Sequence, residues 1–289
     1  MSLRQSAPRP LRILGRSMAV RWGTATAPAR TLPSFVLAGA QRAGTTSLYR
    51  ALMSHPLVFP PVLHKGVNYF DVNYDRGIAW YQAHFPLQAP TRARTRRTPG
   101  APVTFDASGY YMFHPLAPRR MATDLPDLKV ITMLRDPIER AYSAHSHELA
   151  RGFETESFER AVELEDERLE GEVARMDAEP HYYSSTHRHH AYLRRGQYAE
   201  QLVRLLEAFP SEQILVVESE NFFKTPEAEY HRILEFLGLP VIMPSRFDRY
   251  NGRSRSPMAA STRAQLRQHF ESHDAALAQL LGHEPAWLL

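Results

Sequence analysis

The sequence predicts an α/β fold, a single domain with a central, mostly parallel β-sheet flanked by helices. Short apolar runs that are rich in β-branched residues and bounded by turn residues predict buried strands. Segments with helical periodicity lie between these runs along the 289-residue chain. Because strands that alternate with helices usually pair in parallel, helices are expected on both faces of the sheet.

Four runs are predicted as strands: residues 34–40, 102–107, 129–135 and 213–220. The clearest helix has Thr225 as its N-cap and Pro226 at its first helical position, and it ends at Gly238. A second helix is expected to bury one face, which is formed by Leu202, Leu205, Leu206 and Phe209. In an open parallel sheet, ligands bind outside the carboxyl ends of the strands, so we expect the site there.

Charge is distributed unevenly along the chain. No Asp or Glu precedes Asp71, whereas nine Arg or Lys residues do. Residues 1–33 hold six Arg and four Pro without apolar periodicity, which predicts a basic, disordered arm before an α/β domain over residues 34–289. An organelle-targeting peptide is the alternative for this arm, because such peptides are also Arg-rich and poor in acidic residues. Residues 91–100 are predicted as a basic loop, and the acidic residues 153–172 as a solvated helix face.

The composition excludes several classes of protein. The chain has no cysteine, which rules out disulfides, zinc–thiolate sites and thiol nucleophiles. No apolar stretch approaches the roughly 20 residues that a membrane-spanning helix needs. We therefore expect a soluble, cytoplasmic protein, with organelle targeting by the arm as the alternative. The basic excess is not accompanied by a nucleic-acid recognition motif, and an anionic small molecule explains a basic pocket equally well.

The stretch "FVLAGAQRAGTTSLYRAL", residues 35–52, is similar to a phosphate-binding loop that lacks its lysine. A P-loop reads G-x-x-x-x-G-K-[ST], and Gly39 and Gly44 have that spacing, but Thr45 follows them. Backbone N–H groups of residues 43–46, the helix N-terminus and the charge of Arg42 are expected to bind an anion. Without the lysine that reaches β- and γ-phosphates, a single phosphate with one further anionic group fits better than a triphosphate. A structural turn capped by threonines is the alternative.

A second strand-to-helix corner has the sequence "VITMLRDPIERAYSAHSHE". Asp136 and Glu139 are predicted to form a capping box around Pro137 at the first helical position. Arg135 ends the strand, and Ser143 lies two turns into the helix. These two side chains could clamp one phosphate, with Arg135 supplying charge-assisted hydrogen bonds. A capped helix with an ion pair is the alternative.

Together the two motifs resemble the cofactor signatures of sulfotransferases that use 3′-phosphoadenosine-5′-phosphosulfate (PAPS). "QRAGTTSL" is followed roughly ninety residues later by "RDPIERAYS", and "HKGVNYFDVNYDRGIAWYQAHFP", "FDASGYYMFHP", "FLGLP" and "YNGRSRSPM" match further segments in order. The resemblance is to the bacterial and heparan-sulfate-type branch and covers about residues 34–282. It implies a P-loop-like fold and transfer of a sulfuryl group to a hydroxyl of a carbohydrate, lipid or small metabolite. It also implies adenosine 3′,5′-bisphosphate as product and no required metal.

The resemblance assigns roles to individual positions. The 5′-phosphosulfate is expected to contact the loop residues Gln41, Arg42, Ala43, Gly44, Thr45, Thr46 and Ser47. Arg42 occupies a position where family members commonly have Lys, which is thought to stabilise the bridging oxygen as the sulfuryl group leaves. The 3′-phosphate is expected to contact Arg135 and Ser143. A late loop with Gly252, Arg253 and Ser254 is expected to close over the nucleotide, with a solvated turn as the alternative.

The acceptor side departs from the family pattern. Related enzymes often have a catalytic Glu where this chain has Gly66, and sometimes a His where it has Asn68. The remaining candidates for the general base are Asp106, then His64 and, more weakly, His145. Lys65 is expected near the sulfonate. Loss of the usual base leaves an inactive nucleotide-binding or scaffold protein as one alternative, and a small-molecule P-loop kinase as another.

Residues 181–190 are rich in histidine, with His181, His187, His189 and His190. Such a run could bind a metal, but no carboxylate is placed to complete a site. We expect a mobile loop on the acceptor side.

Overall fold

Five parallel strands form one sheet in the part of the chain that the computed structural model describes, residues 9–250 and 256–289. The strand order is β2-β3-β1-β4-β5, with bounds Phe35–Gly39 for β1, Val58–Phe59 for β2, Val103–Asp106 for β3, Lys129–Leu134 for β4 and Ile214–Glu218 for β5. The four predicted strands are β1, β3, β4 and β5, each within two residues of its expected ends. Strand β2 was not predicted, because two residues carry no periodicity.

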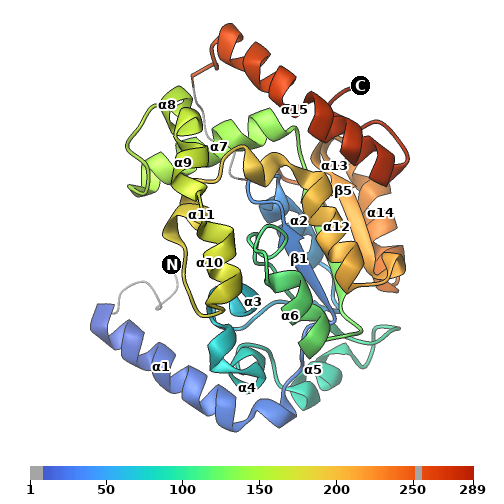
Figure 1. Ribbon diagram of the computed structural model, residues 1–289. Coiled ribbons are helices and arrows are strands. Elements are labelled where there is room, and N and C mark those ends of the chain that lie inside the picture. Colours follow the sequence, from blue (N-terminus) through green and yellow to red (C-terminus); the bar gives the residue numbers. More distant parts are fainter. Residues whose placement is uncertain (1–8, 251–255) are drawn as a thin grey trace.

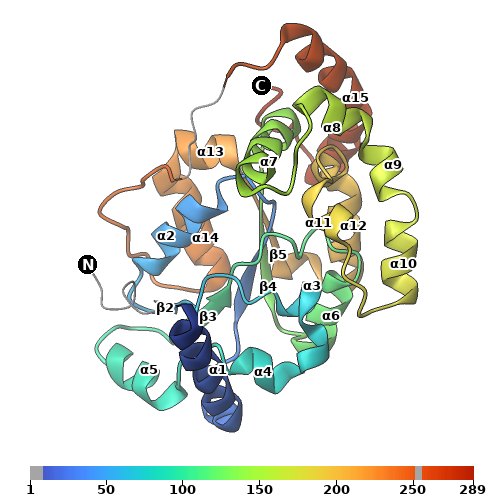
Figure 2. The ribbon, with the colours of Figure 1, turned by 90° about the vertical axis from the view of Figure 1, so that its left-hand side faces the viewer.

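Helices cover both faces of the sheet. Figure 2 shows α2 and α14 on one side of the strands and α6 and α12 on the other. The α-helices in chain order are α1 Arg9–Ala25, α2 Thr45–Met53, α3 Tyr69–Val72, α4 Ile78–Gln82, α5 Gln88–Thr95, α6 Ala117–Asp124, α7 Pro137–Arg151, α8 Phe158–Glu163, α9 Glu165–Leu169, α10 Glu172–Ala178, α11 Ser185–His189, α12 Tyr198–Ala208, α13 Ser219–Lys224, α14 Pro226–Leu237 and α15 Ala260–Leu281. Short 3₁₀ helices are η2 Ala27–Ala29, η3 Tyr74–Arg76, η4 Arg194–Gly196 and η5 Ser211–Gln213.

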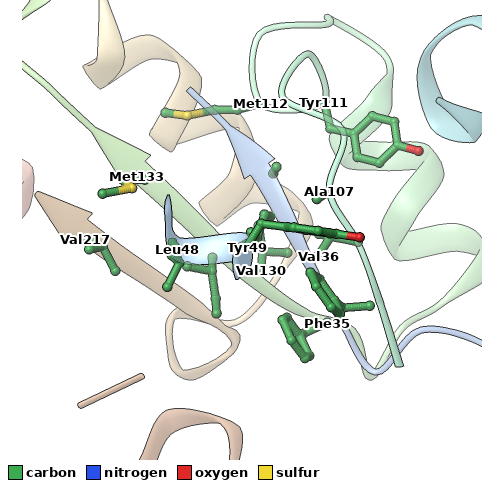
Figure 3. Close-up of a cluster of buried hydrophobic side chains, with 14 of the residues drawn as sticks. Phe35, Val36, Leu48, Tyr49, Ala107, Tyr111, Met112, Val130, Met133 and Val217 are labelled. Carbon is green, nitrogen blue, oxygen red and sulfur yellow. The ribbon is translucent and has the colours of Figure 1, made fainter. Parts of the chain in front are cut away.

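The main core lies between the sheet and its helices (Figure 3). Phe35 of β1 stacks on Phe105 of β3 with ring centroids 4.9 Å apart, and Tyr49 of α2 packs on Phe105 at 5.1 Å. The five residues of β1 are buried, as expected for a central strand that is covered on both faces. Burial of β1 and α2 holds the loop between them in one position.

The strand order predicts where a ligand binds. β1 lies between β3 and β4, so the chain leaves β1 toward one half of the sheet and later returns to the other half at β4. The loops that follow β1 and β4 therefore diverge to opposite sides and leave a crevice at the carboxyl ends of these strands. Val36 pairs with Val130 and Leu37 with Ile131, so the two strands end side by side.

The predicted helices are α14 and α12, with two differences in detail. Thr225 holds the N-cap position of α14, but its hydroxyl donates to the carbonyl of Asn221 and does not cap the helix. In α12, Leu202 and Leu205 are buried, whereas Leu206 is 42% exposed. The stripe on this helix is therefore narrower than predicted.

The structure of the N-terminal segment differs from the disordered arm that the sequence predicts. Residues 9–25 form α1, which lies beside α4 (Figure 1). The buried side chain of Arg30 then ties the chain to the body: its Nη1 donates to the carbonyl of Phe85 at 2.6 Å, and its own carbonyl accepts from Gln82 and Gln88. Residues 1–8 lie outside the described residues. A domain boundary near residue 33 stays a prediction.

Two charged segments also differ from expectation. The first half of the segment 91–100 belongs to α5 rather than to a loop. Within the acidic segment, Glu154 and Glu165 are buried: Glu154 accepts from Arg168 and Tyr192, and Glu165 accepts from the backbone N–H groups of residues 193 and 194. Sequence pattern alone does not distinguish a carboxylate on a solvated face from one that holds a neighbouring loop. None of the helices within residues 9–250 and 256–289 is both long and apolar enough to cross a membrane.

Candidate active site

The first corner, between β1 and α2, has the backbone of an anion-binding loop. Arg42 and Gly44 both have positive φ angles, 74° and 94°, which turns the N–H groups of the loop inward. A side chain at Gly44 would meet the Phe223 ring at 3.0 Å and Met133 at 3.2 Å, so this position requires glycine both for its conformation and for space. The N-terminus of α2 at Thr45 adds its partial positive charge.

The second corner, between β4 and α7, is built as predicted except for the capping box. The Asp136 carboxylate accepts from the N–H groups of Ile138 and Glu139 at 2.8 and 3.3 Å. Glu139 does not return the bond: the N–H of Asp136 donates to Glu220 of α13, and Glu139 pairs with Arg135 at 3.7 Å and with Arg263. The start of α7 is therefore fixed from a third element, α13.

Arg42 joins the two corners. Its Nε donates to Oγ of Ser143 at 3.1 Å, while Nη1 of Arg135 donates to the carbonyl of Arg42 at 3.2 Å. A cavity of about 560 Å³ opens over this junction; its lining residues are Arg42, Gly44, Thr45, Thr46, Arg135, Ser143, Ser219, Glu220, Phe223, Lys224, Arg249 and Tyr250. The structure thus brings together residues that are about a hundred positions apart in the sequence, in one cavity whose lining, among the described residues, includes four cationic side chains.

Arg249 and Tyr250, which precede the predicted late loop, line the same cavity. The N–H of Tyr250 donates to Oγ of Ser47 at 2.9 Å, and Arg249 lies over the Phe223 ring at 4.3 Å. The aromatic face of Phe223 and the phosphate-binding corner therefore lie within one cavity. The predicted Gly252, Arg253 and Ser254 lie outside the described residues.

Arg195 is a buried residue that contacts the first corner, and it was not predicted as a site residue. It is 3% exposed, and Nη1 donates to Oε1 of Gln41 in the loop. Nη2 donates to the carbonyls of His187 and Arg188 at 3.1 and 2.9 Å. Burial lowers its pKa to about 10, which leaves it charged at neutral pH. Sequence reading missed it because only the fold places η4 against Gln41.

A turn formed by residues 64–68 borders the corner on its other side. Nζ of Lys65 donates to Oγ1 of Thr46 at 3.2 Å and lies over the Tyr49 ring at 4.6 Å. Desolvation of the ammonium by its neighbours, followed by the charge of Arg50, lowers the pKa of Lys65 to about 8, although the residue as a whole is exposed to solvent. The ammonium that is missing after Gly44 in the sequence is thus supplied from a different segment.

Comparisons with known proteins agree with this geometry. A family model described as "Sulfotransferase domain" matches residues 32–268. The chain belongs to the sulfotransferase family. It is 30% identical over 289 aligned residues to bovine bifunctional heparan sulfate N-deacetylase/N-sulfotransferase 2, covering 89% of this chain but 31% of that protein. It is 28% identical to mouse heparan sulfate glucosamine 3-O-sulfotransferase 6, covering 79% of this chain and 58% of that one.

A solved sulfotransferase structure has the same fold. The sulfotransferase from Alicyclobacillus acidocaldarius is 28% identical, with a TM-score of 0.65, over 88% of this chain and 97% of that chain. The α/β, P-loop-like fold expected from the resemblance is therefore confirmed. The chain spans about a third of the length of the bifunctional relatives that it matches.

Asp106, the first candidate for the base in this sulfotransferase, has a structural task instead. It is 0% exposed. Its carboxylate accepts from the N–H groups of Val67 and Ala107 at 3.0 and 2.7 Å and from the hydroxyl of Tyr111 at 2.7 Å. Burial raises its pKa. The carboxylate holds the 64–68 turn and is fully buried, so the structure does not support it as the base.

His64 has the tautomer that a base requires. Its Nδ1 lies 2.8 Å from the carbonyl of Gly66. Because a carbonyl oxygen only accepts, Nδ1 carries the proton in the neutral ring, and Nε2 is the basic nitrogen. His145 is different: it is buried in α7, and its Nε2 contacts the carbonyl of Glu156.

The backbone conformation at position 66 requires glycine. Its φ is +74°, and a Cβ there would approach the carbonyl of Ala107 at 3.0 Å. A glutamate at this position would therefore strain the turn. In this chain the family's usual base cannot occupy that position without a change of backbone.

Asp71 of α3 is a buried carboxylate that the sequence analysis did not select. It is 5% exposed, and its Oδ2 has no hydrogen-bond partner within the described residues. Burial raises its pKa to about 6, against the opposing charge of Arg188. Nothing in its spacing marks it, since its environment is formed by segments far away in the chain.

Part of the histidine-rich segment is the short helix α11, where a loop was expected. His187 and His189 are buried in α11 and its surroundings. Nδ1 of His187 lies 2.6 Å from the Tyr110 hydroxyl, and Nδ1 of His189 lies 2.9 Å from Oε2 of Glu148. These histidines fix the segment that accepts hydrogen bonds from Arg195, which is a structural role.

Proposed function

We propose that the protein transfers a sulfuryl group from PAPS to a hydroxyl or amine of a carbohydrate. The observation that carries the proposal is the junction of the two phosphate-binding corners through Arg42 and Ser143. The relatives named above are N- and 3-O-sulfotransferases of heparan sulfate, which supports a carbohydrate acceptor. The comparisons give no support to the kinase alternative. A cytoplasmic location stays a prediction.

The residues of the cavity fit a nucleotide with phosphates at two ends. The loop N–H groups with Thr45 and Thr46 would hold the 5′ end, and Arg135 with Ser143 would hold the 3′-phosphate, since guanidinium groups bind phosphate through charge-assisted hydrogen bonds. The Phe223 ring would offer an apolar face to the adenine ring of the nucleotide. When bound, PAPS supplies the activated sulfuryl group.

The chain's own groups would stabilise charge and accept a proton. Arg42 belongs to the loop and Lys65 contacts its Thr46, so both cations would be available to stabilise charge that develops on the transferred group. Nε2 of His64 would accept the proton of the acceptor hydroxyl or amine. We expect His64→Gln to lower kcat/KM by about 10²- to 10⁴-fold with unchanged bisphosphate affinity. His231→Gln, at a partly exposed position of α14, should leave both unchanged. A loss under threefold would place the base elsewhere.

A thermal-shift titration tests nucleotide choice. Adenosine 3′,5′-bisphosphate at 100 times its Kd should stabilise the protein by about 2.7 kcal/mol through mass action, and ATP with magnesium should stabilise it much less. Equal or greater stabilisation by ATP with magnesium would overturn the nucleotide assignment. Release of bisphosphate from PAPS on addition of an aminated or hydroxylated sugar then separates an enzyme from an inactive binding protein.

A further inference from the structure

A second cavity lies on the far side of the 64–68 turn from the nucleotide site. Its volume is about 950 Å³, and its lining residues are Ser17, Val20, Arg21, Thr24, Ala25, His64, Val67, Asn68, Asn73, Arg76, Trp80 and His84. His64 and Asn68 face this cavity, while Lys65 between them contacts Thr46 of the phosphate loop. One turn therefore separates the two cavities, and the candidate base lines the second.

Helix α1 forms one wall of this second cavity. Five of the lining residues, Ser17 to Ala25, belong to α1, which precedes the family match at residue 32. Figure 1 shows α1 lying along α4 at the lower edge of the molecule. The contact is close: a Cβ at Gly23 would meet the carbonyl oxygen of Ala83 at 2.7 Å and its Cβ at 2.9 Å. Gly23 and Arg30 thus dock α1 at a defined distance from the body.

The chemistry of the lining fits a charged sugar. Its charged side chains within the described residues are Arg21 and Arg76, both cationic. Trp80 offers an aromatic face, with Arg76 over it at 5.1 Å, and the remaining polar groups are hydroxyls, amides and imidazoles. An aromatic surface with a few placed polar groups suits a sugar ring, and two guanidinium groups suit carboxylates or sulfates.

We propose that α1 completes the acceptor site, and that Arg21 and Arg76 select an acceptor sugar that carries a carboxylate or sulfate group. This proposal rests on the proposed function, since it takes the second cavity as the place of the acceptor. It adds a helix outside the matched family region as a determinant of specificity.

Isothermal titration with two oligosaccharide probes tests the proposal. The protein is first saturated with adenosine 3′,5′-bisphosphate, and the binding of that nucleotide is recorded. It is then titrated with a heparin-derived hexasaccharide whose N-sulfates have been removed, or with the neutral hexamer of N-acetylglucosamine. We expect the charged probe to bind more tightly, and Arg21→Gln and Arg76→Gln each to weaken it about 5-fold or more. Arg160→Gln, at an exposed position of α8, is the matched control and should have no effect.

A variant of the helix contact tests the role of α1 as a whole. Gly23→Val should push α1 away from Ala83 and weaken the charged probe as much as Arg21→Gln does, without changing the bisphosphate affinity. The proposal would be overturned if the neutral probe bound as tightly as the charged one, or if the charged probe did not bind. It would also be overturned if Arg21→Gln and Gly23→Val had no effect on the affinity for the charged probe. Failure of the bisphosphate to bind would instead overturn the proposed function.

Discussion

At the scale of the residue, Lys65 replaces in space what the phosphate loop lacks in sequence. Its ammonium contacts Thr46 and has a pKa lowered to about 8 by desolvation and by the charge of Arg50. A lysine with a lowered pKa is charged below that pH and neutral above it. The charge that it offers to an anionic ligand is therefore lost as pH rises through about 8.

Bisphosphate affinity should accordingly fall in mildly alkaline solution. Between pH values of about 7.5 and 9.5 we expect a loss of about tenfold or more, because one cation near the phosphate is neutralised. Lys65→Arg keeps its charge across this range and should abolish most of the decline. Calorimetric Kd values at several pH values provide the measurement. A wild-type affinity that stays flat would show that Lys65 does not contact the ligand.

The buried carboxylate of Asp71 is expected to lower the free energy of unfolding at neutral pH. Its folded-state pKa of about 6 lies above the ordinary value of 3.8, so the native state holds the proton more tightly and stability falls as pH rises from about 4 to 6. Asp71→Asn should raise the free energy of unfolding by about 3 kcal/mol at pH 7.5 and by about 1 kcal/mol at pH 4.5. Urea denaturation at both pH values measures this difference. Asp75→Asn, in exposed η3, is the control; a gain that does not depend on pH would contradict the linkage.

At the scale of the element, η4 couples the phosphate loop to α11. Arg195 bonds at once to Gln41 and to two carbonyls of the histidine-rich segment. Only a planar guanidinium can direct several donors in this way. The short helix η4 thus connects the loop after β1 to the histidine-rich segment.

Arg195→Lys tests whether the hydrogen bonds of Arg195 link these two segments. The lysine keeps the charge but cannot make all three bonds, so we expect bisphosphate affinity to fall about tenfold and the melting temperature to drop by several degrees. Arg194→Lys changes the exposed neighbour, which pairs with Asp166 on the surface, and should leave both quantities nearly unchanged. Combining Arg195→Lys with Gln41→Ala should cost less affinity than the sum of the two. Full additivity would argue against the coupling.

At the scale of the whole molecule, the nucleotide cavity is assembled from the loops that follow β1 and β4, the helices α2, α7 and α13, and residues 249–250. Ligand binding should therefore protect separate stretches of chain together. Hydrogen exchange with and without bisphosphate should show slower exchange at the N-termini of α2 and α7 and around residues 247–250, and no change in α9 and α10. Protection confined to α2 alone would mean that the second corner does not take part in binding.

Much of the fold could be predicted because the determinants are local. The β-branched runs predicted four strands, and Pro226 with Gly238 marked the ends of α14. The spacing of Gly39 and Gly44 and the sequence around Arg135 predicted two anion-binding corners, since both depend on backbone conformations that a few residues determine. Family resemblance then linked the two corners to one nucleotide.

Other features were decided only by the tertiary structure, because they depend on which segments meet. Asp106 looked like a strand-end acid and is a buried anchor; Lys65, Asp71 and Arg195 gained their surroundings from distant parts of the chain. The segment that contains α1 was predicted to be disordered because it is rich in Arg and Pro and lacks apolar periodicity. In the structure, close packing at Gly23 and the hydrogen bonds of Arg30 hold α1 against the body. By itself, then, the sequence determined the strands, the turns and the two corners, where short-range sterics and capping govern. Packing alone decided which charges became buried, paired or poised for a ligand, since burial and pairing are properties of the assembled chain.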